Sequence, residues 1–226
     1  MIYDLHSHIL PGVDHGSINL ECSKQLLQKA SEAGIGTIVA TPHFYMDIDS
    51  ADEFLHRRDR AYAQLRGFAG NIRIIKAAEV ALMPGIEDLP ELSRMCVGDT
   101  KYIMLEMPSD IWNDWVFNAI YVIRARRGLI PVIAHIDRYN EAPLSRLLDM
   151  GLITQVNAEA LLPLRSRTKM LRLFSSGLSH VLGSDVHRNT DAYDKFSRAL
   201  KILGRDRSRR LMKNAQTILS GGEIAR

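Results

Sequence analysis

Histidine and carboxylate side chains end or follow most of the short apolar runs of this sequence. The nine candidates for metal binding are His6, His8, Asp14, His43, Glu79, Glu106, His135, Asp185 and His187. Carboxylates gathered in one cavity would repel each other and lose hydration at high cost unless a cation offset their charge. Imidazoles and carboxylates without a thiolate suit Mn, Fe or Zn better than a cysteine-rich structural zinc site does.

Nine ligands exceed what one ion takes, so we expect two or three ions that share a bridging carboxylate. Each candidate also has an ordinary explanation when it is considered alone. A single histidine at a strand end is more often a hydrogen-bonded structural residue than a ligand, and a single glutamate there is usually solvated. The case for metal therefore depends on a fold that brings the nine residues together.

The elements that would position them alternate between short β-branched runs and longer amphipathic stretches. Strands are predicted at residues 2–6, 37–40, 72–78, 102–106, 130–134, 153–157 and 180–183. Helices are predicted at residues 19–33, 50–68, 112–127, 142–150, 164–176, 192–203 and 207–219. Strands separated mostly by helices indicate a parallel α/β protein, either an open sheet or a barrel. Only a closed barrel would bring all the strand ends, and so all nine residues, to one face.

Composition places the chain among ordinary globular proteins. Of its 226 residues, 46% are hydrophobic and 24% charged, and the formal net charge of +3 gives little reason to expect nucleic acid as a partner. No apolar run approaches the roughly 18 residues of a membrane span, and no secretory signal is visible, so we expect a cytoplasmic protein. Without an internal repeat or a linker, we expect one domain over residues 1–226.

Eight short motifs, in this order along the chain, resemble a known family. They are Asp-x-His-Ser-His, Pro-Gly-Val-Asp, Thr-Pro-His, Ala-Glu, Leu-Glu-Met, Ile-Ala-His-Ile-Asp-Arg-Tyr, Gln-Val-Asn and Ser-Asp-Val-His. The set resembles the PHP (polymerase and histidinol phosphatase) superfamily. More narrowly, it is similar to the bacterial manganese-dependent protein-tyrosine phosphatases that are encoded with capsule and exopolysaccharide clusters.

The resemblance implies a distorted TIM-like (β/α)7 barrel with Mn as the cofactor, at two to three ions per chain and with Fe or Zn as alternatives. The family's arrangement assigns one ion to the positions of His6, His8, Glu79 and Asp185, with Glu79 bridging, a second ion completed by Glu106 and His135, and a third held by Asp14, His43 and His187. It further implies a phosphotyrosine protein as the substrate, namely the tyrosine-rich tail of a bacterial tyrosine kinase. Membrane insertion is not expected, and an oligomer is compatible with the pattern.

Two departures from the family pattern concern the loops around the site. The family usually continues its Val-Asp with a second Asp, whereas His15 follows Asp14 here. The residues after the last motif are Arg188-Asn189-Thr190-Asp191, where the family often has a loop that contains Gly-Arg. Both changes bear on substrate contacts and specificity.

Hydrolysis of a phosphate ester by metal-bound hydroxide, attacking phosphorus in line, is the mechanism we expect. A cysteine phosphatase requires arginine six residues after its cysteine, and those positions after Cys22 and Cys96 hold Gln28 and Tyr102, which excludes that mechanism. The alternatives are a small-metabolite phosphatase of the histidinol-phosphate kind and a metal-binding regulatory protein without turnover.

Arg138 and Arg188 are the candidates for binding the phosphoryl group. Arg138 comes three residues after His135, so its guanidinium would lie on the same rim and could hold phosphate through two hydrogen bonds. We expect it to be both a substrate-binding and a catalytic residue. The alternative is an ion pair with a carboxylate of the metal site. Arg188 is a second substrate-binding candidate.

Overall fold

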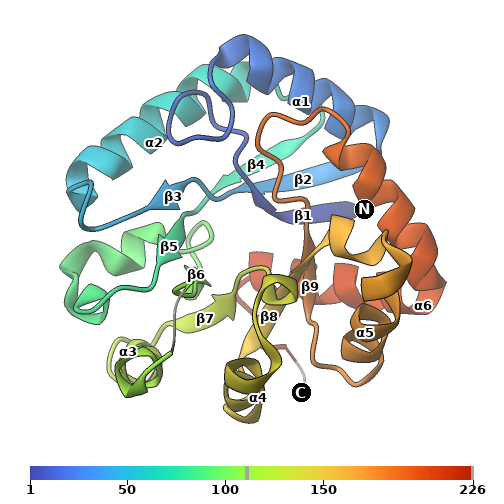
Figure 1. The fold of residues 1–226 in the computed structure, drawn as a ribbon. Helices are drawn as coiled ribbons and strands as arrows, with labels where there is room; N and C mark the ends of the chain where they lie inside the picture. The colour runs from blue at the N-terminus through green and yellow to red at the C-terminus, as the bar shows by residue number, and fades with distance from the viewer. Residues whose placement is uncertain (110–111, 225–226) are drawn as a thin grey trace.

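The computed structural model describes residues 1–109 and 112–224, and it shows a curled parallel sheet with helices around it (Figure 1). The strands are β1 (Ile2–Ser7), β2 (Ile35–Ala40), β3 (His43–Phe44), β4 (Arg73–Lys76), β5 (Glu79–Ala81), β6 (Tyr102–Glu106), β7 (Ile130–Ile133), β8 (Ile153–Asn157) and β9 (Val181–Gly183). Every pairing between them is parallel.

These segments occupy seven positions of a barrel, because β3 continues β2 and β5 continues β4. The hydrogen-bonded orders are β1-β2-β4 and β3-β5-β6-β7-β8-β9. The two sheets meet where β9 ends beside β1: the amide of Asp185 donates to the carbonyl of His6, and the amide of His8 donates to the carbonyl of Val186. The expected distorted TIM-like α/β barrel is confirmed, while its being one domain over residues 1–226 stays a prediction.

A short strand that the sequence did not indicate follows each of the second and third predicted strands. Pro42 has no amide hydrogen to give to a ladder, so β2 stops before it and His43 begins β3. In the third strand the amide of Ala78 donates to the carbonyl of Met95, outside the sheet, and Glu79 then begins β5. Glu79 was expected to follow a strand that ends at Ala78; it begins β5 instead, so that prediction was wrong, although its side chain still lies at the carboxyl edge of the barrel.

The helices follow the predicted order. They are α1 (Leu20–Glu32), α2 (Ala51–Leu65), α3 (Asp114–Ala125), α4 (Glu141–Asp149), α5 (Leu164–Ser175) and α6 (Ala192–Leu219). The 3-10 helices are η1 (Arg66–Phe68), η2 (Ile86–Asp88), η3 (Pro90–Met95), η4 (Ile136–Arg138) and η5 (Ala158–Leu161). Gly204, with φ of 78°, interrupts α6, which corresponds to the two helices predicted there. No helix within the described ranges is both long and apolar enough to cross a bilayer.

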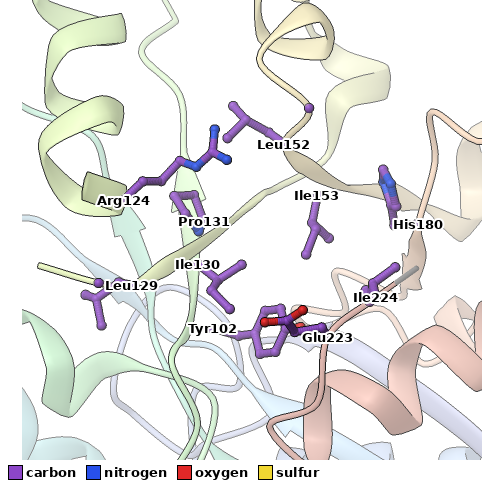
Figure 2. Close-up of a pocket in the computed structure, with 12 residues that line it drawn as sticks. Tyr102, Arg124, Leu129, Ile130, Pro131, Leu152, Ile153, His180, Glu223 and Ile224 are labelled. Atoms are coloured by element: carbon purple, nitrogen blue, oxygen red, sulfur yellow. The ribbon is translucent and has the colours of Figure 1, made fainter. Parts of the chain in front are cut away.

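Apolar side chains from the strands fill the barrel and close the end at which the strands begin. Leu5, Val39 and Met104 pack inside it with Ala215 and Ile218 of α6. A pocket of about 570 Å³ also opens at this end, lined by the first residues of β6, β7 and β8 and by Glu223 and Ile224 (Figure 2). None of the nine predicted metal ligands lines that pocket. The predicted chemistry thus lies at the opposite end, where the carboxyl ends of the strands meet.

Candidate metal centre

Glu79 lies at the centre of a buried cluster of imidazoles. One oxygen, Oε2, lies 3.0 Å from His6 Nε2, 3.2 Å from His8 Nε2 and 3.2 Å from His43 Nδ1. The other, Oε1, lies 2.8 Å from His135 Nε2. The Glu79 side chain is fully buried. A carboxylate that faces four imidazoles from both oxygens has the arrangement needed to bridge two ions.

Asp185 completes the inner part of the cluster. Its Oδ1 lies 3.6 Å from His6 Nε2 and 3.4 Å from His8 Nε2, so both carboxylates face the same two rings. His6, His8 and Glu79 each bring one ligand atom within 4.8 Å of the other two. The structure therefore gathers the four residues expected around the first ion.

The second group lies between β3, β5, β6 and β7. His43, Glu79 and Glu106 bring ligand atoms within 4.8 Å of one another, and His135 Nε2 lies 3.7 Å from Glu106 Oε1. Nδ1 of His135 is buried without a hydrogen-bond partner among the described residues. The residues expected around the second ion thus also meet.

The third group differs in part from the expected set. His43 and His187 meet as expected and form a compact group with His8. The Asp14 oxygens, however, already accept hydrogen bonds: Oδ2 lies 2.6 Å from His8 Nδ1 and accepts from the His43 amide, and Oδ1 accepts from the Gly16 amide. A carboxylate on the far nitrogen of a metal-binding histidine normally orients that ring. A direct ligand role for Asp14 stays a prediction.

Two of the candidate ligands have strained backbones. His135 has φ of 29° and Asp185 has φ of 52°, and no other non-glycine residue in the described part of the chain has positive φ. Such backbones cost free energy and concentrate at functional sites. Gln155, which opens the Gln-Val-Asn motif but was not a candidate ligand, holds both strand ends: its Oε1 accepts from the His135 amide and lies 3.1 Å from His6 Nδ1.

The buried carboxylates and imidazoles of the cluster shift each other's pKa values. Burial lowers the pKa of His6, but the charges of Glu79 and Asp185 outweigh it and raise that pKa to about 9. Burial opposes ionisation of Glu79 too, yet the imidazoles hold its pKa well below the usual range. Cations that displaced these protons would restore the same charge balance. Buried carboxylates and oriented imidazoles together fit divalent ions that take nitrogen and oxygen ligands.

Comparison with known proteins agrees with this site. A family profile described as "Capsular polysaccharide synthesis, CpsB/CapC" matches residues 2–220. The chain belongs to the CpsB/CapC family. It is 28% identical to the tyrosine-protein phosphatase YwqE of Bacillus subtilis, over 99% of this chain and 93% of that protein. It is 30% identical to the tyrosine-protein phosphatase CpsB of Streptococcus pneumoniae, over 89% of each chain.

A solved structure of this CpsB/CapC group has nearly the same fold. It superposes with a TM-score of 0.86 at 26% identity, over 100% of this chain and 97% of that one. It comes from crystallographic work on YwqE from Bacillus subtilis and CpsB from Streptococcus pneumoniae, described as unique metal-dependent tyrosine phosphatases.

The two candidate arginines lie differently with respect to the cluster. Arg138 follows His135 in η4, and its Nη2 donates to Oδ2 of Asp185, while 49% of its side chain remains exposed. The ion pair considered as an alternative is therefore present, and the exposed part of the guanidinium still faces solvent at the rim. Arg188 is exposed, and its Nε donates to the carbonyls of His15 and Gly16. Arg188 thus joins two loops, and a contact with substrate stays a prediction.

Proposed function

We propose that this chain is a metal-dependent protein-tyrosine phosphatase, a phosphoric monoester hydrolase that acts in capsular or exopolysaccharide synthesis. The observation that carries the proposal is the buried set of imidazoles around the Glu79 carboxylate at the carboxyl ends of the strands. Membership of the CpsB/CapC family and the phosphatase names of the relatives support it.

Mn is the proposed metal, at two or three ions per chain, with Fe or Zn as alternatives. His6, His8, Glu79 and Asp185 would hold one ion, and Glu79, Glu106 and His135 a second, with His43 and His187 at the outer edge. Divalent ions supply an activated water near neutral pH and neutralise charge on phosphoryl oxygens. Asp14 holds the His8 ring in place through Nδ1, and Gln155 holds the His6 ring.

A groove beside the cluster has the composition needed to bind an aromatic ester. Its volume is about 400 Å³, and it reaches the cluster through Tyr45 and Glu106. Met83, Met107 and Pro108 form apolar walls that suit a phenyl ring. The exposed part of Arg138 is available to hold the phosphoryl group, because only one of its nitrogens is needed for Asp185.

Neither cysteine offers a competing nucleophile. Cys96 is buried, and burial raises its pKa to about 12, so its thiol stays protonated. Cys22 lies on α1, and neither cysteine belongs to the metal groups. The proposed substrate is a phosphotyrosine protein, the tyrosine-rich tail of a bacterial tyrosine kinase. A cytoplasmic location and the kinase partner stay predictions, and an oligomer remains compatible with the sequence.

A substrate panel tests this proposal. Protein stripped by a chelator and then reloaded with Mn2+ is assayed on a phosphotyrosine peptide, a phosphoserine peptide and histidinol phosphate, and kcat/KM is compared. We expect turnover only after reloading and the highest kcat/KM for the phosphotyrosine peptide. A clear preference for histidinol phosphate would favour the metabolite phosphatase instead. Bound metal without turnover on any of the three would favour a regulatory protein.

A further inference from the structure

The second half of α6 covers the end of the barrel at which the strands begin. Gly204 interrupts the helix, and beyond it Ala215 and Ile218 are buried among the strand side chains that close the barrel. Asn214 Nδ2 donates to the carbonyl of His180, just before β9, at 2.9 Å. The outer face of this helical segment therefore forms part of the surface at that end of the molecule.

That outer face carries cations in a line. Arg205, Arg209 and Lys213 follow one another at four-residue intervals, and residues with this spacing lie above one another on a helix. All three are exposed, whereas Leu211 and Ala215 of the same segment are buried on the side that faces the barrel. The cations therefore point away from the end of the barrel.

Two neighbouring elements extend this positive surface. Arg172 lies in the last turn of α5, and Lys101 directly precedes β6. Both are exposed. We call Lys101, Arg172, Arg205, Arg209 and Lys213 the basic end face. Within the described residues, the lysines and arginines that form ion pairs are others, so these five cations keep their charge unpaired.

Acidic side chains near the basic end face do not cancel its charge. Asp99, Asp206 and Glu223 are exposed beside it, while Arg207 and Arg210 of α6 are also exposed and add to the positive side. The formal net charge of the whole chain is only +3, so this end of the barrel is more positive than the rest of the molecule. Such an uneven distribution of charge favours an anionic partner at this end.

The basic end face is not arranged around a cavity. None of its five residues lines the pocket at this end, whose wall includes the carboxylate of Glu223 instead (Figure 2). A small anion needs donors that converge on it, whereas cations spread over an outer helix face suit an extended anionic surface. The face also lies at the end of the barrel opposite the metal cluster, so it does not border the site where a substrate peptide would bind.

Two exposed apolar side chains lie at the same end of the barrel. Met1, just before β1, is 83% exposed, and Phe68 of η1, between the end of α2 and the start of β4, is 52% exposed. Exposed apolar groups together with cations are typical of surfaces that bind bilayers, because the cations meet anionic head groups while the apolar groups enter the interface. Both kinds of side chain thus favour a lipid surface as the partner.

We propose that the basic end face binds the surface of a bilayer that contains anionic lipids. Binding is peripheral, through contacts of lysine and arginine with head groups, and no helix inserts. The carboxyl ends of the strands then face away from the bilayer, which leaves the metal cluster open to a protein substrate. The inference goes beyond the proposed function and does not depend on metal binding or turnover.

Vesicle sedimentation with the full-length chain tests the proposal. Vesicles of phosphatidylcholine alone are compared with vesicles in which phosphatidylglycerol replaces part of it. We expect binding only to the vesicles with phosphatidylglycerol, and loss of that binding at about 0.5 M NaCl, because salt screens charges at an exposed surface.

Charge changes on α6 identify the face that binds. Each lysine or arginine near an anionic surface contributes about fivefold to partitioning, so Arg209→Gln with Lys213→Gln should weaken binding by about 25-fold. Arg209→Glu with Lys213→Glu should weaken it further. The matched control is Arg60→Glu with Arg165→Glu, which makes the same change in net charge at exposed positions of α2 and of the start of α5. That control should bind nearly as the wild type does.

Melting temperatures separate lost binding from lost folding, and we expect those of the glutamine pair to equal the wild type because both side chains are exposed. Equal binding to the two kinds of vesicle, or an equal loss in the control pair, would overturn the proposal. Stronger binding to double-stranded DNA or to poly-glutamate than to phosphatidylglycerol vesicles at the same salt concentration would overturn it too. None of these measurements involves metal or a phosphate ester, so a failure here leaves the proposed function standing.

Discussion

At the residue scale, the arrangement around Asp185 indicates what Arg138 does. Asp185 contacts His6 and His8 through Oδ1, and its Oδ2 accepts from Asn157 Nδ2 at 2.9 Å as well as from Arg138. The carboxylate therefore keeps partners without the guanidinium. Arg138, half-exposed at the rim, is free to contact a phosphoryl group with its remaining donors.

Replacing Arg138 should thus separate metal binding from turnover. We expect Arg138→Ala to keep its bound metal and to lose about 10²–10³-fold in kcat, the typical cost of removing a preorganised donor. Arg138→Lys should recover only part of that, because an ammonium lacks the planar fork. Metal content and kcat are measured on the same preparations, with His135→Ala as the control that loses both. Metal loss in proportion to activity would assign Arg138 to supporting Asp185.

The thiols give a second prediction at this scale. Thiolate is the reactive form, and burial raises the pKa of Cys96 to about 12, so iodoacetamide at pH 8 should modify the partly exposed Cys22 and leave Cys96 free in the folded protein. Phosphatase activity of the metal-loaded enzyme should be unchanged by this treatment. Mass spectrometry counts the modified thiols. Inactivation in step with alkylation would argue against the metal mechanism.

Residue types alone were enough to select residues that the fold brings together. The nine candidates were chosen because histidines and carboxylates end apolar runs, and the fold brings eight of them into contact around Glu79 or at its edge, with Asp14 behind His8. The contact that Gln155 makes with the site was missed. It depends on a partner 149 positions away in the sequence, His6, and local patterns contain no information on such a pair.

At the element scale, the strands were located by their apolar runs, and two of them, β6 and β8, begin and end at the expected residues. The breaks at Pro42 and at Ala78 were not expected. The second break depends on the carbonyl of Met95, which reaches Ala78 from η3 only in the folded chain. These interruptions turn His43 and Glu79 toward each other, as their pairing across β3 and β5 shows.

Close packing between strand ends leads to an element-scale prediction. A Cβ on Gly183, the last residue of β9, would lie 2.5 Å from Cβ of His6 and 2.7 Å from Nε2 of Gln155. Gly183→Ala should therefore lower the free energy of unfolding by about 1–3 kcal/mol and weaken metal binding, because β1 and β8 must move apart. Gly67→Ala is the matched control, since a Cβ there meets nothing within 4 Å. Urea unfolding and metal titration measure both effects, and equal behaviour of the two variants would contradict the packing argument.

At the scale of the whole molecule, the cluster draws residues from the first and the last strand of the barrel. His6 lies in β1, and Asp185 lies two residues after the end of β9. Bound ions would therefore hold the barrel closed where its two sheets meet. Ions that bind only the folded state add to its stability. The free energy gained is about 2.7 kcal/mol per ion when the free ion concentration is one hundred times Kd.

Chelation should consequently lower the melting temperature of the wild-type protein. Calorimetry with and without a chelator measures the shift, and added Mn2+ should reverse it. Glu79→Gln removes the carboxylate that contacts four imidazoles, so its melting temperature should not respond to the chelator. An equal response in Glu79→Gln would place the stabilising ions elsewhere in the molecule.

The metal content of the purified chain, measured together with its turnover, tests the central claim most directly. Elemental analysis after mild purification should find two to three ions of Mn, Fe or Zn per chain. The same preparation should hydrolyse a phosphotyrosine peptide, lose that activity when a chelator removes the ions, and regain it when Mn2+ is returned. Less than one transition-metal ion per chain, or full turnover after the ions are gone, would contradict a metal-dependent phosphatase.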